Sequence, residues 1–239
     1  PEPEDVLRIL EANRVTHFFT VPTLCQQLLG VPGAATRFDL SGLRALKVGG
    51  MPTPVALQER FMEVFGIPIL PGFGMAEASG AALTCYPENY RFGTVGLPQP
   101  HCQARILGED GCELPAGEVG RLSVRAPYLI REYWRDPEKT KSAIDADGWL
   151  LTDDLARMEA DGFYVHLGRA DEVIISAGWT LSPDEIEEAL RAYPGVAEAA
   201  VIGLGDADKG QIPVAAVVRG PGAPAEAAFT AGLKAFLAA

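Results

Sequence analysis

The first 85 residues alternate between helical and strand-like patterns of apolar positions. Apolar side chains recur at helical spacing within residues 4–13, and Pro54 begins a second amphipathic stretch that predicts a helix. Short apolar runs predict three buried strands, at His17–Val21, Arg44–Val48 and Ile67–Leu70. Such an alternation of strands and helices is typical of an α/β layer with a largely parallel sheet.

After about residue 90 the pattern changes to short strands separated by turns. Runs at Gln103–Leu107 and Val119–Val124 alternate with clusters of glycine, aspartate and proline. The pair Asp161-Gly162 lies between two apolar runs, which is typical of a β-hairpin. We therefore expect residues 90–168 to form a β-rich block, either a small β-barrel-like part or a distorted sheet.

Residues 170–239 mix strands and helices and are expected to form a separate small α+β domain. The run Ser182-Pro183-Asp184-Glu185 places Ser at the N-cap, Pro at the first helical position and Glu at the third, which predicts a capped helix at Pro183–Arg191. The other expected elements are strands at Glu172–Ser176, Val196–Leu204 and Pro213–Val218, a linker at Gly220-Pro221-Gly222-Ala223-Pro224 and a helix at Ala225–Ala238.

Charge and composition exclude several classes of function. The 239 residues carry 32 acidic and 20 basic side chains, and a pI near 4.7 argues against nucleic acid or an anionic membrane as partner, because both recruit basic patches. No apolar run reaches the roughly 18–20 residues of a transmembrane helix. The four cysteines form no Cys-x-x-Cys pair, which disfavours a zinc site, and without a secretory signal they indicate a reducing, cytoplasmic location.

The run Gly72-Phe73-Gly74-Met75-Ala76-Glu77 follows an apolar strand and is the first candidate binding segment. Glycines at a strand end let the backbone approach a ligand, Phe73 offers a face to a flat ring, and Glu77 offers a hard oxygen to Mg²⁺. A Gly-x-Gly turn without any ligand is the alternative. The run lacks the third glycine of a dinucleotide fingerprint, and Ser79 lacks the surrounding frame of a hydrolase nucleophile.

Two further segments place charges beside apolar strands. The run Trp149-Leu150-Leu151-Thr152-Asp153-Asp154 could present paired carboxylates to sugar hydroxyls, or it could form a solvated turn. The run from Gly168 to Gly178 joins Arg169 and Asp171 directly to an apolar strand. These two charged residues could clamp a ligand, act as a hinge or form a surface ion pair.

Taken together, these segments resemble the adenylate-forming (AMP-binding) enzymes, a superfamily that includes acyl-CoA synthetases, peptide-synthetase adenylation domains and luciferases. The most specific stretch runs from Gly148 to Leu190, and Pro137-Glu138-Lys139-Thr140 and Gly93-Thr94-Val95-Gly96-Leu97-Pro98 also match. The resemblance implies that residues 1–168 are the C-terminal portion of the large AMP-binding domain, with an α/β part at 1–85 and a β-rich part at 90–168. Residues 170–239 would be the small, mobile α+β domain, truncated at its end.

The resemblance also implies which residue meets which ligand. By resemblance, Glu77 would bind Mg²⁺, and Phe73 and the loop Gly50-Met51-Pro52 would contact adenine. Gly74 and Met75 would border the acyl pocket. Asp154 and Arg169 would bind the ribose, and Gly178 would lie beside the pantetheine arm of CoA. Asp171 matches the hinge about which the small domain rotates.

Three departures from the family pattern bear on function. Ala76 lacks the hydroxyl that Thr or Ser usually offers to the α-phosphate, and one hydrogen bond to a charged group contributes about 1.5–3 kcal/mol. Asp153 replaces the usual glycine and adds a negative charge near the ribose. Trp179-Thr180 replaces the more usual aromatic-Arg pair.

The ends of the chain suggest a piece of something longer. The chain lacks an initiator Met and stops at Leu237-Ala238-Ala239, inside a helical pattern. By resemblance, the phosphate-binding loop would lie before Pro1 and the catalytic Lys beyond Ala239. No catalytic residue is therefore assigned within this chain, and the chain alone is expected to be inactive.

The resemblance implies an AMP-forming acid–thiol ligase, an acyl-CoA synthetase. It would convert a carboxylic acid, in the first instance a fatty acid, to an acyl-adenylate with Mg-ATP and then transfer the acyl group to CoA. Its cofactors and partners would be ATP or AMP, Mg²⁺, CoA and the small-molecule acid, with no nucleic acid. An enzyme that loads a carrier protein is the first alternative, and a non-catalytic fragment that binds nucleotide or a partner protein is the second. The residues name neither the acid nor the oligomeric state.

Overall fold

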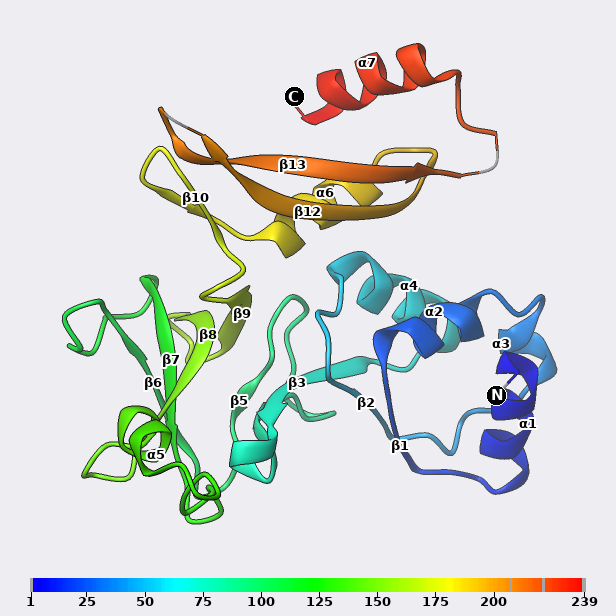
Figure 1. Ribbon diagram of the computed structural model, residues 1–239. Helices are drawn as coiled ribbons and strands as arrows, with labels where there is room; N and C mark the ends of the chain where they lie inside the picture. The colour runs from blue at the N-terminus through cyan, green and yellow to red at the C-terminus, as the bar shows by residue number, and fades with distance from the viewer. Residues whose placement is uncertain (1, 207, 221, 238–239) are drawn as a thin grey trace. The chain divides into compact units, whose positions relative to one another are not determined.

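The chain folds into two compact units in a computed structural model that describes residues 2–206, 208–220 and 222–237 (Figure 1). The first unit is Pro1–His166 and the second is Leu167–Ala239. The expected linker residue Pro221 and the expected helix end at Ala238 lie outside the described residues. The assignment of the two units to the large and small domains of the adenylate-forming fold stays a prediction.

A five-stranded sheet forms the first half of the first unit. In sheet order, its strands are β1 (His17–Thr20), β2 (Ala45–Val48), β3 (Ile69–Met75), β4 (Gly80–Thr84) and β5 (Leu97–Pro98). The expected parallel pairing is confirmed for β1, β2 and β3. Strand β4 runs antiparallel to β3 because the turn between them is only a few residues long, whereas a parallel connection needs about a dozen or more residues.

Four helices pack around this sheet and share one core with it. They are α1 (Pro3–Ala12), α2 (Pro22–Leu29), α3 (Ala34–Arg37) and α4 (Val55–Phe65). Both α1 and α2 begin with proline, whose missing N–H leaves no bond unmade at the first helical position. The core includes Leu7, Leu28, Leu46, Phe61 and Ile69, all almost fully buried. This packing fixes the strand ends that carry the candidate site.

The second half of the first unit is a four-stranded sheet. In sheet order, its strands are β6 (Gln103–Leu107), β7 (Val119–Arg125), β8 (Leu150–Met158) and β9 (Tyr164–Arg169), and α5 (Pro137–Ala143) precedes β8. Strand β9 begins in the first unit and its last three residues belong to the second. The hairpin expected at Asp161-Gly162 is confirmed, since Gly162 has φ +86° in the turn between β8 and β9. The described residues form no closed barrel here, which corrects the barrel-like expectation. Four strands are too few to close, because a barrel with a filled interior needs about eight.

The second unit is a four-stranded sheet with two helices. Its elements are β10 (Ile174–Ser176), β11 (Trp179–Leu181), α6 (Pro183–Arg191), β12 (Val196–Asp206), β13 (Gly210–Arg219) and α7 (Glu226–Leu237), with strand order β11-β10-β13-β12. The expected cap of α6 is confirmed, because Ser182 Oγ accepts a hydrogen bond from Glu185 N at 3.4 Å. Leu190, Val201 and Phe229 join α6, β12 and α7 in a core of their own.

Expected and observed elements agree in kind and differ at their ends. Strand β3 continues to Met75 instead of ending at Leu70, because its last four residues pair with β4. Strand β10 begins at Ile174 instead of Glu172. Within the described residues, no helix is both long enough and apolar enough to cross a lipid bilayer.

Candidate functional site

The carboxyl ends of the parallel strands β1, β2 and β3 meet at one edge of the sheet, where α/β proteins commonly bind ligands. The loop Gly49–Pro52 follows β2 at this edge. A Cβ added to Gly49 would lie 3.5 Å from Phe19 Cζ and 3.7 Å from the Gly72 carbonyl oxygen. The expected adenine loop therefore lies beside the segment Gly72–Glu77. Two exposed apolar side chains, Phe19 and Met51, lie near the same strand ends.

Gly74 is required by the pairing of β3 with β4. A Cβ at this position would lie 2.7 Å from the Gly80 carbonyl carbon and 2.8 Å from Ala81 Cα, next to a β-bulge after Phe73. Real side chains do not tolerate such distances to backbone atoms, so the close approach of the strands is sufficient to explain this glycine. The expected places of Gly74 and Met75 beside the acyl pocket stay predictions.

The carboxylate of Glu77 is held by a tyrosine. Glu77 lies in η1 (Ala76–Ala78), a single turn of 3₁₀ helix after β3, and the Tyr133 hydroxyl donates a hydrogen bond to Glu77 Oε1 at 3.0 Å. Burial, this hydrogen bond and the negative charges of Glu77 and Asp153 raise the pKa of Tyr133 to about 12. The phenol therefore keeps its proton at every ordinary pH and remains a donor to the carboxylate.

Residues 128–133, here called the strap, form two more hydrogen bonds, one with η1 and one with Ser79, the residue after it. Ile130 N donates a hydrogen bond to the Glu77 carbonyl oxygen at 2.8 Å, and Ser79 Oγ donates to the Tyr128 carbonyl oxygen at 2.6 Å. The strap thus fixes both the backbone and the carboxylate of Glu77. This contact was not predictable from the sequence, because Tyr133 lies 56 residues from Glu77 and no local pattern joins them.

Asp153 and Asp154 point to opposite faces of β8, because successive side chains of a strand alternate. Thr152 and Asp154 are buried, whereas Asp153 is exposed. The two carboxylates therefore cannot act as a pair on one sugar, which corrects that interpretation. Thr152 Oγ1 accepts a hydrogen bond from Asp154 N at 3.2 Å and donates to the Leu122 carbonyl oxygen at 2.8 Å, which fixes the strand beside Asp154.

Asp154 and Phe73, the expected ribose and adenine residues, meet at His166. Asp154 Oδ1 lies 2.8 Å from His166 Nε2, and the imidazole stacks on the Phe73 ring with centroids 5.4 Å apart. Phe73 is itself only 8% exposed. His166 is not among the site residues predicted from the sequence, although the predicted hairpin, which puts Asp154 and His166 on its two arms, was an available signal.

In the second unit, Arg169 and Asp171 form the surface ion pair that the sequence analysis left open. Arg169 Nε donates a hydrogen bond to Asp171 Oδ1 at 3.0 Å, and both side chains are exposed. This hydrogen bond holds the pKa of the Asp171 carboxyl below its usual value. Exposed pairs contribute little to folding stability. The ribose role of Arg169 and the hinge role of Asp171 stay predictions.

Gly178 lies in the two-residue turn between β10 and β11. Ala177 has φ +50° and Gly178 has φ +83°, and positive φ at both central residues is typical of a type I′ hairpin turn. A Cβ added to Gly178 would find no atom within 4 Å among the described residues. The turn is therefore one sufficient reason for glycine here, and the expected contact with CoA stays a prediction. The side chain of Thr180, one of the family departures, lies outside the described residues.

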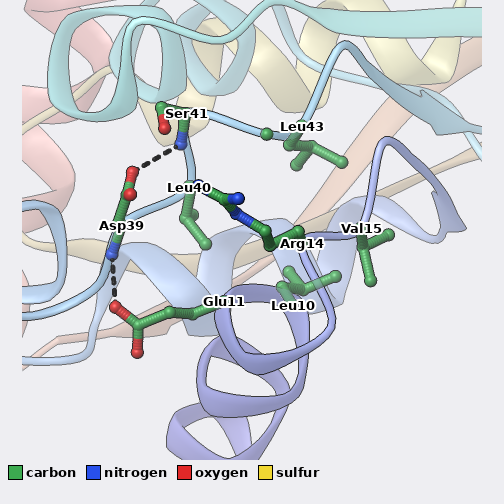
Figure 2. A pocket seen from close by; sticks show the side chains of 9 residues that line it. Leu10, Glu11, Arg14, Val15, Asp39, Leu40, Ser41 and Leu43 are labelled. Carbon is green, nitrogen blue, oxygen red and sulfur yellow. Dashed lines mark hydrogen bonds between the residues drawn. The ribbon is translucent and has the colours of Figure 1, made fainter.

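A small pocket near the end of α1 contains none of the candidate site residues (Figure 2). Asp39 N donates a hydrogen bond to Glu11 Oε1 at 2.8 Å, and Ser41 N donates to Asp39 Oδ1 at 2.9 Å. Hydrogen bonds from the side chain and the backbone of Ser41 lower the pKa of Asp39. These carboxylates already tie the turn after Asp39 to α1, which indicates a structural role for the pocket.

Comparison with known sequences identifies the chain. The family described as AMP-binding enzyme matches residues 1–134, and the AMP-binding enzyme C-terminal domain matches residues 185–239. A feruloyl-CoA synthase of an Amycolatopsis species is 35% identical over 92% of this chain and 45% of the relative. A long-chain-fatty-acid–CoA ligase of Bacillus subtilis (strain 168) is 34% identical over 94% of this chain and 40% of the relative. The chain thus spans less than half the length of these relatives.

Solved structures agree with the sequence matches. ATP-bound MatB from Rhodopseudomonas palustris superposes with a TM-score of 0.89 at 34% identity, covering 98% of this chain and 46% of that protein. The anthranilate CoA ligase AuaEII in complex with anthranoyl-AMP gives a TM-score of 0.86 at 28% identity, covering 99% and 45%. On the family match, which takes in more than half of its residues, and on this shared fold, the chain belongs to the AMP-binding enzymes.

Proposed function

We propose that the complete protein is an AMP-forming acid–thiol ligase, which activates a carboxylic acid with ATP and passes the acyl group to CoA. The observation that supports this most is the grouping of Phe73, Asp154 and Glu77, three residues of the family motifs, in one unit. The relatives named as CoA ligases cover nearly the whole chain, which supports the same reaction class.

In this proposal the first unit binds the nucleotide. Phe73 rests against the adenine base, and because His166 already stacks on this ring, the base would take the opposite face or the edge. The carboxylate of Asp154 accepts hydrogen bonds from the ribose hydroxyls. Its Oδ1 is engaged by His166, so we expect Oδ2 to be the oxygen closest to the sugar.

The residues around Glu77 fit a magnesium ion. Mg²⁺ prefers hard oxygen ligands and is commonly held by one or two carboxylates together with substrate phosphates. Glu77 supplies a half-buried carboxylate whose orientation is fixed by Tyr133. The described residues contain no cluster of three or more His, Cys, Asp or Glu side chains able to hold a metal, so phosphate and water oxygens would complete the shell. When bound, the ion would offset negative charge on the ATP phosphates.

The proposed reaction has two steps. In the first, a carboxylate oxygen of the acid attacks the α-phosphorus of ATP, an oxygen–phosphorus bond forms, and pyrophosphate leaves with the electron pair of the broken bond. In the second, the CoA thiolate attacks the acyl carbon, a carbon–sulfur bond forms, and AMP leaves with the electron pair of the broken carbon–oxygen bond. This chain contributes orientation of the nucleotide through Phe73 and Asp154. Ala76 supplies no hydroxyl, so donors to the α-phosphate must come from other groups.

The acid is proposed to have an apolar body, with a fatty acid as the first candidate. Phe19, Val21 and Met51 are exposed apolar side chains at the carboxyl ends of β1 and β2. Exposed apolar groups gathered at a binding edge favour an apolar ligand, because contact removes both surfaces from water. An aromatic acid would satisfy the same surface, whereas a short dicarboxylic acid would not.

The proposed function is tested by offering the complete protein a panel of acids with Mg-ATP. Release of pyrophosphate with a fatty acid, ferulate or malonate would identify the acid class, and CoA and a phosphopantetheinylated carrier protein would be offered side by side. Thioester formation with CoA is the expected result. Transfer to the carrier alone would support the carrier-loading alternative. Absence of pyrophosphate release with every acid would overturn the proposal and favour a non-catalytic binding protein.

Tyr133→Phe is expected to raise the Mg²⁺ concentration needed for half-maximal adenylation by about two- to tenfold, the effect of losing one net hydrogen bond. The substitution leaves the ring in place and removes only the donor to Glu77 Oε1. Tyr128→Phe is the matched control, since its hydroxyl lies beside Cys102 instead. A magnesium titration of pyrophosphate release measures the effect, and identical curves for Tyr133→Phe and the control would show that the tyrosine does not act on the metal site.

Gly178→Asn is expected to preserve pyrophosphate release in a single turnover and to lower thioester formation by about tenfold, the effect of overfilling a narrow channel. Asn tolerates the positive φ of this position, so the substitution adds a side chain without straining the turn. A loss of thioester formation would then come from crowding of the channel and not from backbone strain. Gly222→Asn, at another positive-φ glycine with open space around it, is the control. Normal thioester formation by Gly178→Asn would mean that the hairpin turn alone explains the glycine.

A further inference from the structure

One histidine contacts two side chains that we propose to bind the nucleotide. His166, on β9, places Nε2 2.8 Å from Asp154 Oδ1 on β8. The same imidazole stacks on Phe73, on β3, with ring centroids 5.4 Å apart and an angle of 29° between the planes. Three strands from two sheets therefore contribute to one continuous contact of ring, imidazole and carboxylate.

The hydrogen bond between His166 and Asp154 has a defined direction. An ionised carboxylate can only accept hydrogen bonds, so His166 Nε2 carries the hydrogen that points to Asp154 Oδ1. The side chains of Asp154 and His166 are 13% and 20% exposed, so neither can turn freely into water. Hydrogen bonds of this charge-assisted kind are stronger and more directional than neutral ones. The imidazole thus fixes the plane of the carboxylate.

We propose that His166 is a positioning residue for the nucleotide. It holds the Asp154 carboxylate in the orientation that accepts from the ribose hydroxyls, and it sets the plane of the Phe73 ring against which the base rests. The inference rests on the proposed function, because it requires Asp154 to bind ribose. It deepens that function by adding a residue through which the base and sugar contacts are aligned with each other.

The test compares AMP with 2′,3′-dideoxy-AMP, measuring Kd by calorimetry on the complete protein. His166→Phe keeps an aromatic ring beside Phe73 and removes the donor to Asp154. We expect it to raise the Kd of AMP about tenfold while changing that of dideoxy-AMP less than about twofold. His166→Gln restores a donor near the place of Nε2, and its Kd for AMP should stay within about threefold of the unchanged protein.

Three further variants complete the design. Asp154→Asn should also weaken AMP more than dideoxy-AMP, because it removes the negative charge and replaces one carboxylate oxygen by an NH₂ group that cannot accept from a ribose hydroxyl. His101→Asn changes an exposed histidine with φ +66°, a conformation that Asn tolerates, and should leave both Kd values unchanged. His166→Leu, which is smaller and has no donor, replaces His166→Phe if the larger ring prevents folding, as judged by thermal unfolding, and the same selective loss is expected.

The outcomes separate the inference from the proposed function. In one outcome, Asp154→Asn raises the Kd of AMP more than that of dideoxy-AMP, whereas His166→Phe changes both Kd values equally or not at all. This outcome would overturn the positioning role of His166 and leave the ribose contact of Asp154 in place. Equal weakening of both nucleotides by Asp154→Asn would overturn the ribose contact and, with it, the role of His166. Selective loss in both variants, with rescue by His166→Gln, would support the inference.

Discussion

Gly96→Ala is expected to destabilise the first unit by about 2–6 kcal/mol, a large part of the stability of an ordinary domain. The added Cβ would overlap the carbonyl group of Thr84 and the backbone nitrogen of Cys85. Gly96 also has φ +90°, a conformation that L residues rarely adopt. Overpacking and backbone strain each cost about 1–3 kcal/mol, and here they add at one residue. Backbone atoms cannot rotate away as a side chain can, so β4 would have to separate from the segment before β5.

The loss should extend beyond β4 because Gly96 joins the two sheets of the first unit. Its carbonyl oxygen accepts a hydrogen bond from Tyr164 N at 3.0 Å, and Val95 N donates to the Tyr164 carbonyl oxygen at 2.8 Å. Tyr164 begins β9, the strand that also carries His166. Displacing Gly96 therefore moves the strand that supports Asp154, and we expect AMP binding to fall together with stability.

Gly117→Ala is the control for Gly96→Ala, because Gly117 has φ +94° but open space around its added Cβ. It isolates the strain of the backbone conformation, about 1–3 kcal/mol, from the collision. Urea unfolding of both variants measures the difference. Equal destabilisation by the two substitutions would mean that the contact with Thr84 relaxes without cost.

The parts of the fold that were predictable from the sequence are those set by local patterns. Alternating apolar runs located β1, β2, β6 and β7, and the Ser182 cap located the start of α6. The Asp161-Gly162 pair located the β8–β9 turn, since few residues other than glycine adopt the positive φ observed there. The extent of β3 was not predictable, because its last residues become a strand only by pairing with β4.

The site residues that belong to motifs in a fixed order along the chain were predictable. The contacts between side chains that are distant in the sequence were not. Phe73, Glu77 and Asp154 were located by motifs that recur in a fixed order. The partners that orient two of them, Tyr133 for Glu77 and His166 for Asp154, belong to contacts made only by the folded chain. Strand alternation, applied to Asp153 and Asp154, would have excluded the paired-carboxylate interpretation without any structure.

Glu77→Gln is expected to lower the rate of adenylation by about 10²–10³ and to raise the Mg²⁺ requirement, because one preorganised charged group at a reacting phosphate commonly contributes about that much. Glutamine has the size of glutamate and keeps an oxygen that can accept the hydrogen bond from Tyr133, so the strap should remain in place. The substitution therefore removes the negative charge while leaving the local fold intact. Thermal unfolding in the absence of ligand should show little change.

Glu132→Gln is the matched control for Glu77→Gln, since Glu132 is an exposed carboxylate on the same strap. It removes an equal charge at the residue next to Tyr133 and should leave the magnesium dependence unaltered, because exposed charges are screened by water and salt. Pyrophosphate release is titrated with Mg²⁺ for both variants at saturating ATP. If Glu77→Gln and Glu132→Gln give the same magnesium dependence, Glu77 is a carboxylate that Tyr133 holds for structural reasons, and the metal must be held elsewhere in the complete protein.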